Sequence, residues 1–183
     1  YGDMVLFTSG WGTTTPREYI LEVPETMPEP PPVEPDARAV GRGTVYDTGT
    51  SITTQSGTSA ESGSSFLLLV SWEDGPDISS VTDSKGNTYT LLGSVQNPSG
   101  SPNSAQYLCA DGEGGAGHTA TINFSGNNIY GVAHLIEIVG CTADPLDKHV
   151  QGTDGSSPYT VSTDTLAQAD EVVVAFFAPQ TSA

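Results

Sequence analysis

Basic residues are scarce in this chain. Only five Lys and Arg side chains stand against 22 Asp and Glu, which gives a net charge of −17 over 183 residues. Such a surface repels phosphate backbones, and no Lys/Arg cluster is present to make counterion-releasing contacts. The sequence therefore predicts no nucleic-acid partner, and favours an outward-facing acidic surface or a docking site for a basic partner.

Long apolar runs and cysteines are also few. No stretch approaches the roughly 20 apolar residues that a transmembrane helix needs, so no membrane partner is predicted. The two cysteines, Cys109 and Cys141, fall on separate predicted strands. Cys109 shares its strand parity with Ala105 and Tyr107, which predicts a buried thiol acting as a small hydrophobe. A disulfide between the two stays open, because sequence cannot establish their separation.

A helical apolar stripe is missing too, and period-2 patterns dominate from Gly41 onward. Phe66–Val70 is continuously apolar, as in a strand buried on both faces, and His118–Phe124 alternates with His118 on the apolar side. We predict an all-β fold, an antiparallel β-sandwich of jelly-roll or Ig-like type. The expected strands, separated by Gly-, Asp-, Asn- and Pro-rich turns, are Thr44–Asp47, Ser51–Thr54, Ser65–Trp72, Ile78–Thr82, Thr88–Val95, Ala105–Ala110, His118–Phe124, Ile129–Val139, His149–Gln151, Tyr159–Ser162 and Glu171–Ala178.

An extended Pro-rich N-terminal arm is predicted to precede this domain. Pro24–Pro35, PETMPEPPPVEP, contains six prolines, so it cannot form a helix or a central strand and favours polyproline II. We predict an arm over residues 1–40, with short strands and a Pro-rich linker, and a β-sandwich over residues 41–183. The chain starts at Tyr1 and stops just after an apolar strand, so we expect it to be cut from a longer polypeptide, with the sandwich truncated at its C-terminal end. The arm is either a plain linker or a segment that lies across a neighbouring subunit. In the second case large apolar side chains, which are enriched at interfaces, are expected to anchor it. The expected anchors are Met4, Leu6, Phe7, Trp11, Tyr19 and Ile20.

Signatures of catalysis and metal binding are weak. There is no G-x-S-x-G motif, and the three histidines lie on different predicted strands without ligand spacing. His134 is predicted to be a hydrogen-bonded core or interface residue. Glu137 should be paired or at a rim, and a glycosidase-like pair with Glu73 is a weaker alternative. No catalytic residue, metal site or cofactor is predicted, and structural calcium at one of the Asp/Gly-rich turns, such as Asp83–Asn87, stays open.

Several stretches resemble a β-sandwich module common in phage structural proteins and bacterial surface proteins. The resemblance covers about Ser64–Ala178 and implies a fold, without any catalytic motif to carry over. The residues that carry it are Phe66–Thr90, with VTDSKGNTYT at Val81–Thr90, then Ser104–Ala110, His118–Phe124 followed by Ser125 and Gly126, Ala143–Asp147, and Ala169–Ala175.

Together the arm and the resemblance predict a non-enzymatic virion structural protein of a bacteriophage. The specific expectation is a capsid decoration, or cement, protein at the virion surface. Its expected partners are the major capsid protein or another virion protein, and it is expected to form a homo-oligomer, with a trimer as the named possibility; a head-fibre or tail protein is the next choice. The alternative is a secreted or cell-surface adhesion module that binds glycans, which an exposed Trp72 or Tyr159 on a loop rim would favour. A hydrolase, the third choice, would need a pocket with two carboxylates or a Ser–His pair.

Overall fold

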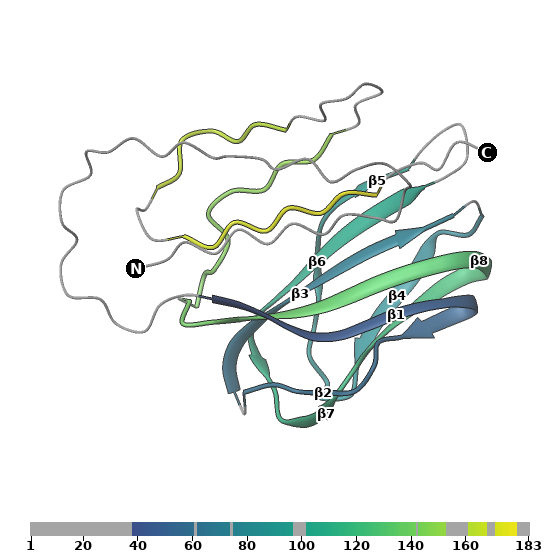
Figure 1. Ribbon diagram of the computed structural model, residues 1–183, viewed down its shortest axis with the longest axis horizontal. Helices are drawn as coiled ribbons and strands as arrows, with labels where there is room; N and C mark the ends of the chain where they lie inside the picture. The colour runs from purple at the N-terminus through teal and green to yellow at the C-terminus, as the bar shows by residue number, and fades with distance from the viewer. Residues whose placement is uncertain are drawn as a thin grey trace, which may run out of the picture.

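The structure, a computed structural model, describes residues 38–60, 62–73, 75–96, 102–141, 143–152, 161–167 and 171–178. All regular elements in these residues are β-strands (Figure 1). Within the same residues, no helix is long and apolar enough to cross a membrane. The strands are β1 (Arg38–Thr53), β2 (Gly57–Thr58), β3 (Ser62–Trp72), β4 (Ile78–Asp83), β5 (Thr90–Val95), β6 (Asn103–Glu113), β7 (Ala116–His118) and β8 (Ala120–Val139).

Six of these strands form one antiparallel sheet. Its order is β1-β8-β3-β6-β5, and β4 pairs with β8 outside this path. The short strands β2 and β7 form a separate two-stranded sheet. The prediction of an all-β antiparallel domain is confirmed, while its assignment to a jelly-roll or Ig-like sandwich stays a prediction.

The sheet curls because its two longest strands bend. The second half of β8 pairs with β3 and with the first half of β1, from Arg38 opposite Val139 to Asp47 opposite Gly131. The first half of β8 pairs instead with β4 and with the end of β1, where Ile52 lies opposite Ile122. The β1–β8 register shifts on both sides of Gly49, so the bend falls between the two paired regions.

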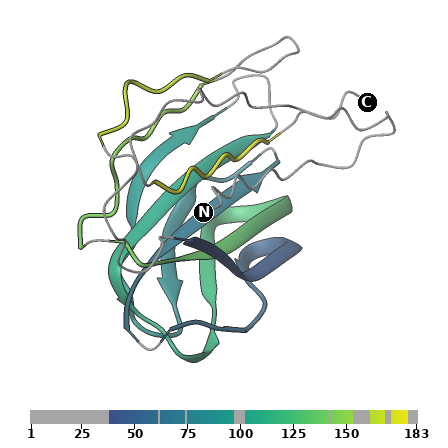
Figure 2. The same cartoon turned by 60° about the vertical axis from the view of Figure 1, so that its left-hand side comes forward.

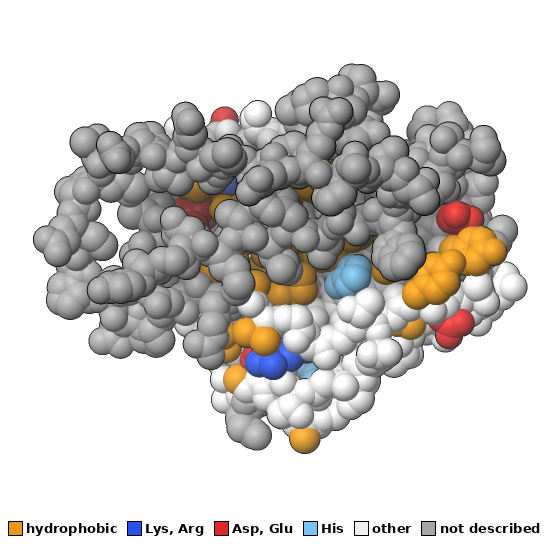
Figure 3. All heavy atoms as spheres, in the orientation of Figure 1, with side chains coloured by type: hydrophobic (Ala, Val, Ile, Leu, Met, Phe, Trp, Pro, Cys, Tyr) orange, Lys and Arg blue, Asp and Glu red, His pale blue; other side chains and the backbone are white. Residues whose placement is uncertain are grey.

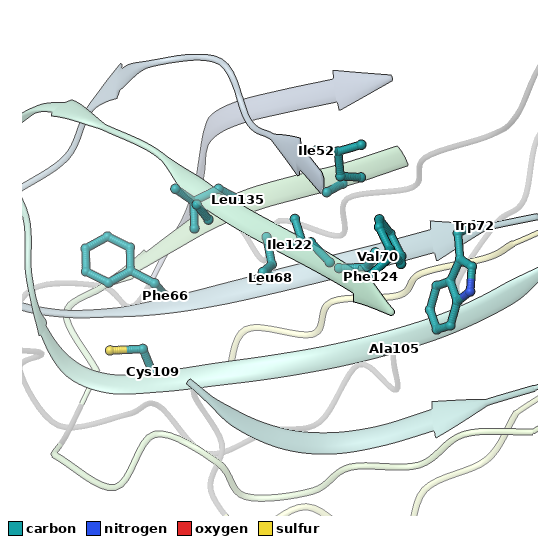
Figure 4. Packing of buried hydrophobic residues seen from close by; sticks show 12 residues of the cluster. Ile52, Phe66, Leu68, Val70, Trp72, Ala105, Cys109, Ile122, Phe124 and Leu135 are labelled. Carbon is teal, nitrogen blue, oxygen red and sulfur yellow. The ribbon is translucent and has the colours of Figure 1, made fainter. Parts of the chain in front are cut away.

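The hydrophobic core fills the inside of this curl. Alternate residues of β3 and β8 point into it, as the two-residue period of a strand requires. Figure 4 shows the apolar side chains of both strands gathered between the ribbons. The cluster consists of Ile52, Phe66, Leu68, Val70, Trp72, Ala105, Cys109, Ala120, Ile122, Phe124, Ala133 and Leu135.

The opposite side of the sheet, which we call the outer face, carries the other parity of the same strands. Leu69 on β3 lies opposite His134 on β8, which in turn lies opposite Thr44 on β1. Residues 171–178 run along this face, drawn in yellow in Figure 1 and Figure 2. Phe176 makes an edge contact with the His134 ring, at 6.3 Å between ring centroids. The outer face is therefore partly covered by a segment that follows the sheet in sequence.

Several strand predictions need correction. Two pairs of predicted strands fall largely within single long strands. Thr44–Asp47 and Ser51–Thr54 fall largely in β1. His118–Phe124 and Ile129–Val139 fall largely in β8, and His118 itself ends β7. His149–Gln151 is not a strand, and Glu171–Ala178 contains only an isolated bridge at Val174. Tyr159 lies outside the described residues, as do residues 1–37, which hold nearly all of the predicted arm.

Candidate functional site

The interface anchors predicted from sequence are not part of the described structure. Met4, Leu6, Phe7, Trp11, Tyr19 and Ile20 all lie outside the described residues. The candidate sites are therefore the polar clusters and exposed surfaces of the residues between 38 and 178 that the structure describes.

A Ser–His–Asp cluster joins the small β2–β7 sheet to the end of β4. The ring of His118 contacts the Ser59 Oγ through Nδ1 at 2.8 Å and the Asp83 Oδ2 through Nε2 at 3.0 Å. Ser59 Oγ also accepts the Gly115 amide at 3.1 Å. Because the ionised Asp83 carboxylate can only accept, Nε2–H donates to it, and in a neutral ring Nδ1 then accepts from the Ser59 hydroxyl.

This cluster has the composition of a hydrolase triad but is closed to substrate. A catalytic serine must face the reacting carbonyl, with the base beside it. Here the His118 side chain is fully buried, Ser59 is only 6% exposed, and the His118 ring packs edge-on against Phe66 at 4.5 Å. The Ser–His pair that a hydrolase would need is thus present as a buried structural link between strands.

Asp83 holds together the turn that follows β4. Its Oδ1 accepts the backbone amides of Lys85 and Asn87, and its Oδ2 accepts the Asn87 side-chain amide and the Tyr89 hydroxyl as well as His118. Burial by itself raises the pKa of Asp83, but the hydrogen bonds from His118, Asn87 and Lys85 outweigh it and lower the pKa below its usual value. With both oxygens engaged, this carboxylate is a turn-forming group rather than a free calcium ligand.

Glu137 is the second buried carboxylate. It lies on β8 with no exposed surface, in an ion pair with the Arg42 guanidinium of β1. The Ala60 amide donates to its other oxygen at 2.7 Å. Burial raises the pKa of Glu137, yet hydrogen bonds from Ser64, Ala60 and Arg42 outweigh this and lower the pKa. The prediction that Glu137 is paired is confirmed. A glycosidase pair with Glu73 is wrong, because Phe66 faces Glu137 in the β3–β8 register while Glu73 follows Trp72 at the opposite end of β3.

The outer face holds a small cleft beneath residues 171–178. It has a volume of about 90 Å³ and is lined by Gly41, Thr44, Leu69, His134, Leu135, Ile136, Val174 and Ala175. The Thr44 hydroxyl and His134 Nδ1 are 3.1 Å apart at this point, and burial lowers the pKa of His134. Small-molecule pockets are several times larger, roughly 300–1,000 Å³, so this cleft cannot enclose a substrate.

Four exposed apolar side chains lie on this face or on the segment that covers it. Val173 and Phe177 are 51% and 45% exposed. Tyr46 on β1 and Tyr130 on β8 are exposed as well, and their rings lie 6.0 Å apart with planes 12° from parallel. Figure 3 shows exposed hydrophobic side chains, with acidic side chains beside them, at the end of the molecule where β1 and β8 bend.

Comparisons with family models, with curated proteins and with solved structures found no match to this chain. The described residues also contain no group of three or more His, Cys, Asp or Glu side chains that could hold a metal ion. The interpretation of function therefore depends on the surfaces of the chain itself.

Sequence reasoning identified some of these features and missed others. Cys109 is buried as predicted, and both thiols are free, so the disulfide alternative is wrong. Trp72, considered as an exposed glycan-binding residue, is 4% exposed and belongs to the core, because it continues the buried parity of β3. The Ser59–His118–Asp83 cluster and the Tyr46–Tyr130 pair were both missed. In each, the residues in direct contact are more than 30 positions apart, and only strand pairing brings them together.

Proposed function

We propose that this chain is a non-enzymatic structural protein of a virion, a decoration or cement protein that stabilises the shell through its arm and displays the β-domain outward. One observation carries the proposal: the segment Glu171–Ala178 contacts the sheet through some of its apolar residues and leaves two large ones in water. Val174 and Ala175 line the outer-face cleft and Phe176 contacts His134, whereas Val173 and Phe177 remain exposed.

An extended segment with apolar residues at consecutive positions is typical of a strand covered on both faces. Covering the exposed apolar surface of Val173 and Phe177 would contribute a favourable free energy of about 25 cal/mol per Å². Apolar patches rimmed by polar residues mark protein–protein contacts. The exposed side of Glu171–Ala178 therefore supports an assembly role.

The predicted arm supplies a chemically suitable partner for this surface. Its anchors Met4, Leu6 and Phe7 are large and apolar, and an extended arm can add main-chain hydrogen bonds along a neighbouring segment. In the proposed assembly, the arm of one subunit packs on the exposed side of Glu171–Ala178 in the next. Closed symmetry, as in a trimer, repeats this contact, and the shell of the major capsid protein multiplies it further.

The test is the oligomeric state of the full chain and of two serine variants, measured by light scattering. Val173→Ser/Phe177→Ser removes the exposed apolar side of the segment. Leu91→Ser removes a similarly exposed residue from β5 and serves as the matched control. We expect a defined oligomer for the full chain and for Leu91→Ser, and monomers for the double variant. Monomers in all three samples, or an unchanged oligomer in the double variant, would overturn the proposal.

A further inference from the structure

The segments that follow the sheet in sequence carry most of the exposed apolar surface. These segments, residues 143–152, 161–167 and 171–178, are drawn in green to yellow beside the sheet in Figure 1 and Figure 2, and we call them the covering layer. Six of the nine large apolar side chains that are exposed among the described residues lie on this layer. Val173 and Phe177 belong to the proposed assembly contact, and the four that it leaves unused are Leu146, Val150, Val161 and Leu166.

Contacts of Asp147 join the three segments of the covering layer. Its Oδ2 accepts the Ala167 backbone amide at 2.9 Å, and its carboxyl group is also in hydrogen-bond contact with the Glu171 side chain. Leu146 and Leu166 each precede one of the two residues that the first bond connects. Both exposed leucines therefore lie beside the same contact between segments.

The first segment of the layer alternates between the sheet and water. His149 Nε2 lies 2.8 Å from Gln106 Oε1 on β6, and the Gln151 side-chain amide donates to the Ser94 carbonyl oxygen on β5 at 3.0 Å. The residues of the other parity, Leu146, Lys148 and Val150, are exposed. The sheet thus holds this segment so that two apolar side chains point outward together.

Carboxylates surround this apolar surface. Residues 143–178 contain six Asp and Glu, one Lys and no Arg. The single lysine, Lys148, is in an ion pair with Asp147 at 3.7 Å. Asp144 and Asp164 are exposed, and each lies two residues before one of the exposed leucines. The layer therefore combines apolar side chains with a negative rim.

We propose that the covering layer is a docking surface for a basic protein, one that presents apolar side chains surrounded by Lys and Arg. Apolar patches with a polar rim mark protein–protein contacts, in which the centre is apolar and the rim stays in water. Opposite charges at the rims speed association and disfavour partners of the wrong sign. A second copy of this chain brings the same carboxylates to the contact, so it matches this part of the layer less well. The inference does not depend on the proposed virion role.

The test titrates the full chain with three short labelled peptides and measures fluorescence anisotropy. The peptides share their leucine positions and carry lysine, glutamine or glutamate at the others. We expect the lysine peptide to bind, the glutamine peptide to bind at least about tenfold more weakly, and the glutamate peptide not to bind. Raising the salt from low to physiological concentration should weaken the lysine peptide several-fold, because the rim charges are screened.

Apolar variants test whether the peptide occupies the layer. Leu146→Ser/Leu166→Ser should weaken binding of the lysine peptide about tenfold, because both side chains lose the apolar surface that the partner covers. Leu91→Ser changes a similarly exposed leucine on β5 and should leave the affinity unchanged. Thermal unfolding of each variant shows whether the fold is intact.

Charge variants test the rim, and they keep the test valid if the leucine variant does not fold. Asp144→Asn/Asp164→Asn should weaken the lysine peptide about tenfold at low salt and make its affinity less dependent on salt. Asp111→Asn/Glu113→Gln removes the same number of charges from exposed positions on β6 and should bind within about twofold of the parent.

Three results would overturn the proposal. The first is a lysine peptide that binds no better than the glutamine peptide. The second is equal weakening by the layer and β6 charge variants, which would mean that net charge alone attracts the peptide. The third is a change of oligomeric state in Leu146→Ser/Leu166→Ser with unchanged peptide affinity, which would make a second copy the occupant. The proposed assembly is tested separately by Val173→Ser/Phe177→Ser, so either idea can fail without the other.

Discussion

Glu137 is a fully buried carboxylate that depends on its neighbours for compensating hydrogen bonds and charge. An isolated carboxylate without exposed surface would cost several kcal/mol, and here Arg42, Ala60 and Ser64 compensate for that cost. Asp83 shows the same principle in a turn, where five hydrogen bonds reach its two oxygens. Both carboxylates connect strands that are distant in sequence.

Replacing Arg42 by methionine should destabilise the fold by about 2–3 kcal/mol, because the buried Glu137 charge loses its partner. The value lies at or below the lower limit of the roughly 3–5 kcal/mol for breaking a fully buried pair, because Arg42 is partly exposed. Urea unfolding measures the change. The double variant Arg42→Met/Glu137→Gln should recover part of the loss; a double variant that is no more stable than Arg42→Met would contradict this explanation.

Stability should fall in acid because Glu137 and Asp83 have pKa values that folding lowers. Their usual pKa values are 4.5 and 3.8. Since the folded values are lower, the stabilisation is complete above the usual values and is lost as the pH falls from them toward the folded values. Urea midpoints at several pH values between 7 and 2 should show this loss in the parent and a weaker pH dependence in Glu137→Gln. Equal pH dependence in the two proteins would exclude Glu137 as a source.

Ser59→Ala tests the structural role of the Ser–His–Asp cluster. The change leaves the Gly115 amide and His118 Nδ1 without their buried partner, at an expected cost of about 1–3 kcal/mol. Thermal and urea unfolding measure it. A variant as stable as the parent would mean that water replaces the hydroxyl, and that the cluster is more open than its burial indicates.

At the scale of elements, the sequence predicted which residues lie in strands better than it predicted where each strand begins and ends. Alternation from His118 to Phe124 correctly identified a buried parity, since His118, Ala120, Ile122 and Phe124 are all buried. The turn-like residues Ser125–Asn128 indicated a break, but there β8 bends without ending. The register passes from Asn123 opposite Ser51 to Asn128 opposite Gly49. Turn-forming residues mark a change of direction, and only tertiary pairing decides whether the strand continues.

The candidate site was less accessible to sequence reasoning than the core. Buried apolar residues can be recognised in the sequence by their spacing or by a continuous apolar run, such as Phe66–Val70. Tyr46 and Tyr130 share no local pattern, and their proximity requires the register of β1 and β8. The sequence left the exposure of Trp72 open, because a large aromatic residue at a strand end has the same sequence signal whether it faces the core or a rim.

Two glycines test the contact between the β6–β7 connection and the segment after β2. A Cβ atom at Gly114 would collide with the carbonyl oxygen of Ala60, which is backbone and cannot rotate away. Gly114→Ala should therefore cost about 1–3 kcal/mol, as overpacking does. Gly41→Ala is the matched control, since no atom lies within 4 Å of its Cβ position, and it should change stability by less than about 0.5 kcal/mol. Similar unfolding midpoints for the two variants would contradict the close approach.

At the scale of the whole molecule, an acidic surface is combined with local apolar patches. A net charge of −17 makes subunits repel one another, so the proposed assembly must rely on short-range apolar contacts such as those expected at Val173 and Phe177. Salt screens this repulsion, with a Debye length of about 8 Å at physiological ionic strength. We expect the oligomer to become tighter as salt is raised from low to physiological concentration, measured by sedimentation equilibrium. Dissociation with added salt would indicate that ion pairs, and not apolar contacts, hold the subunits together.

The central claim, assembly through the arm, is tested most directly by light scattering on the full chain and on a version that starts at Ala39. The account predicts a defined oligomer of trimer size or larger for the full chain and a folded monomer for the shortened chain. Monomers in both samples would contradict it, and the Pro-rich stretch would then be a linker to a surface-displayed binding module.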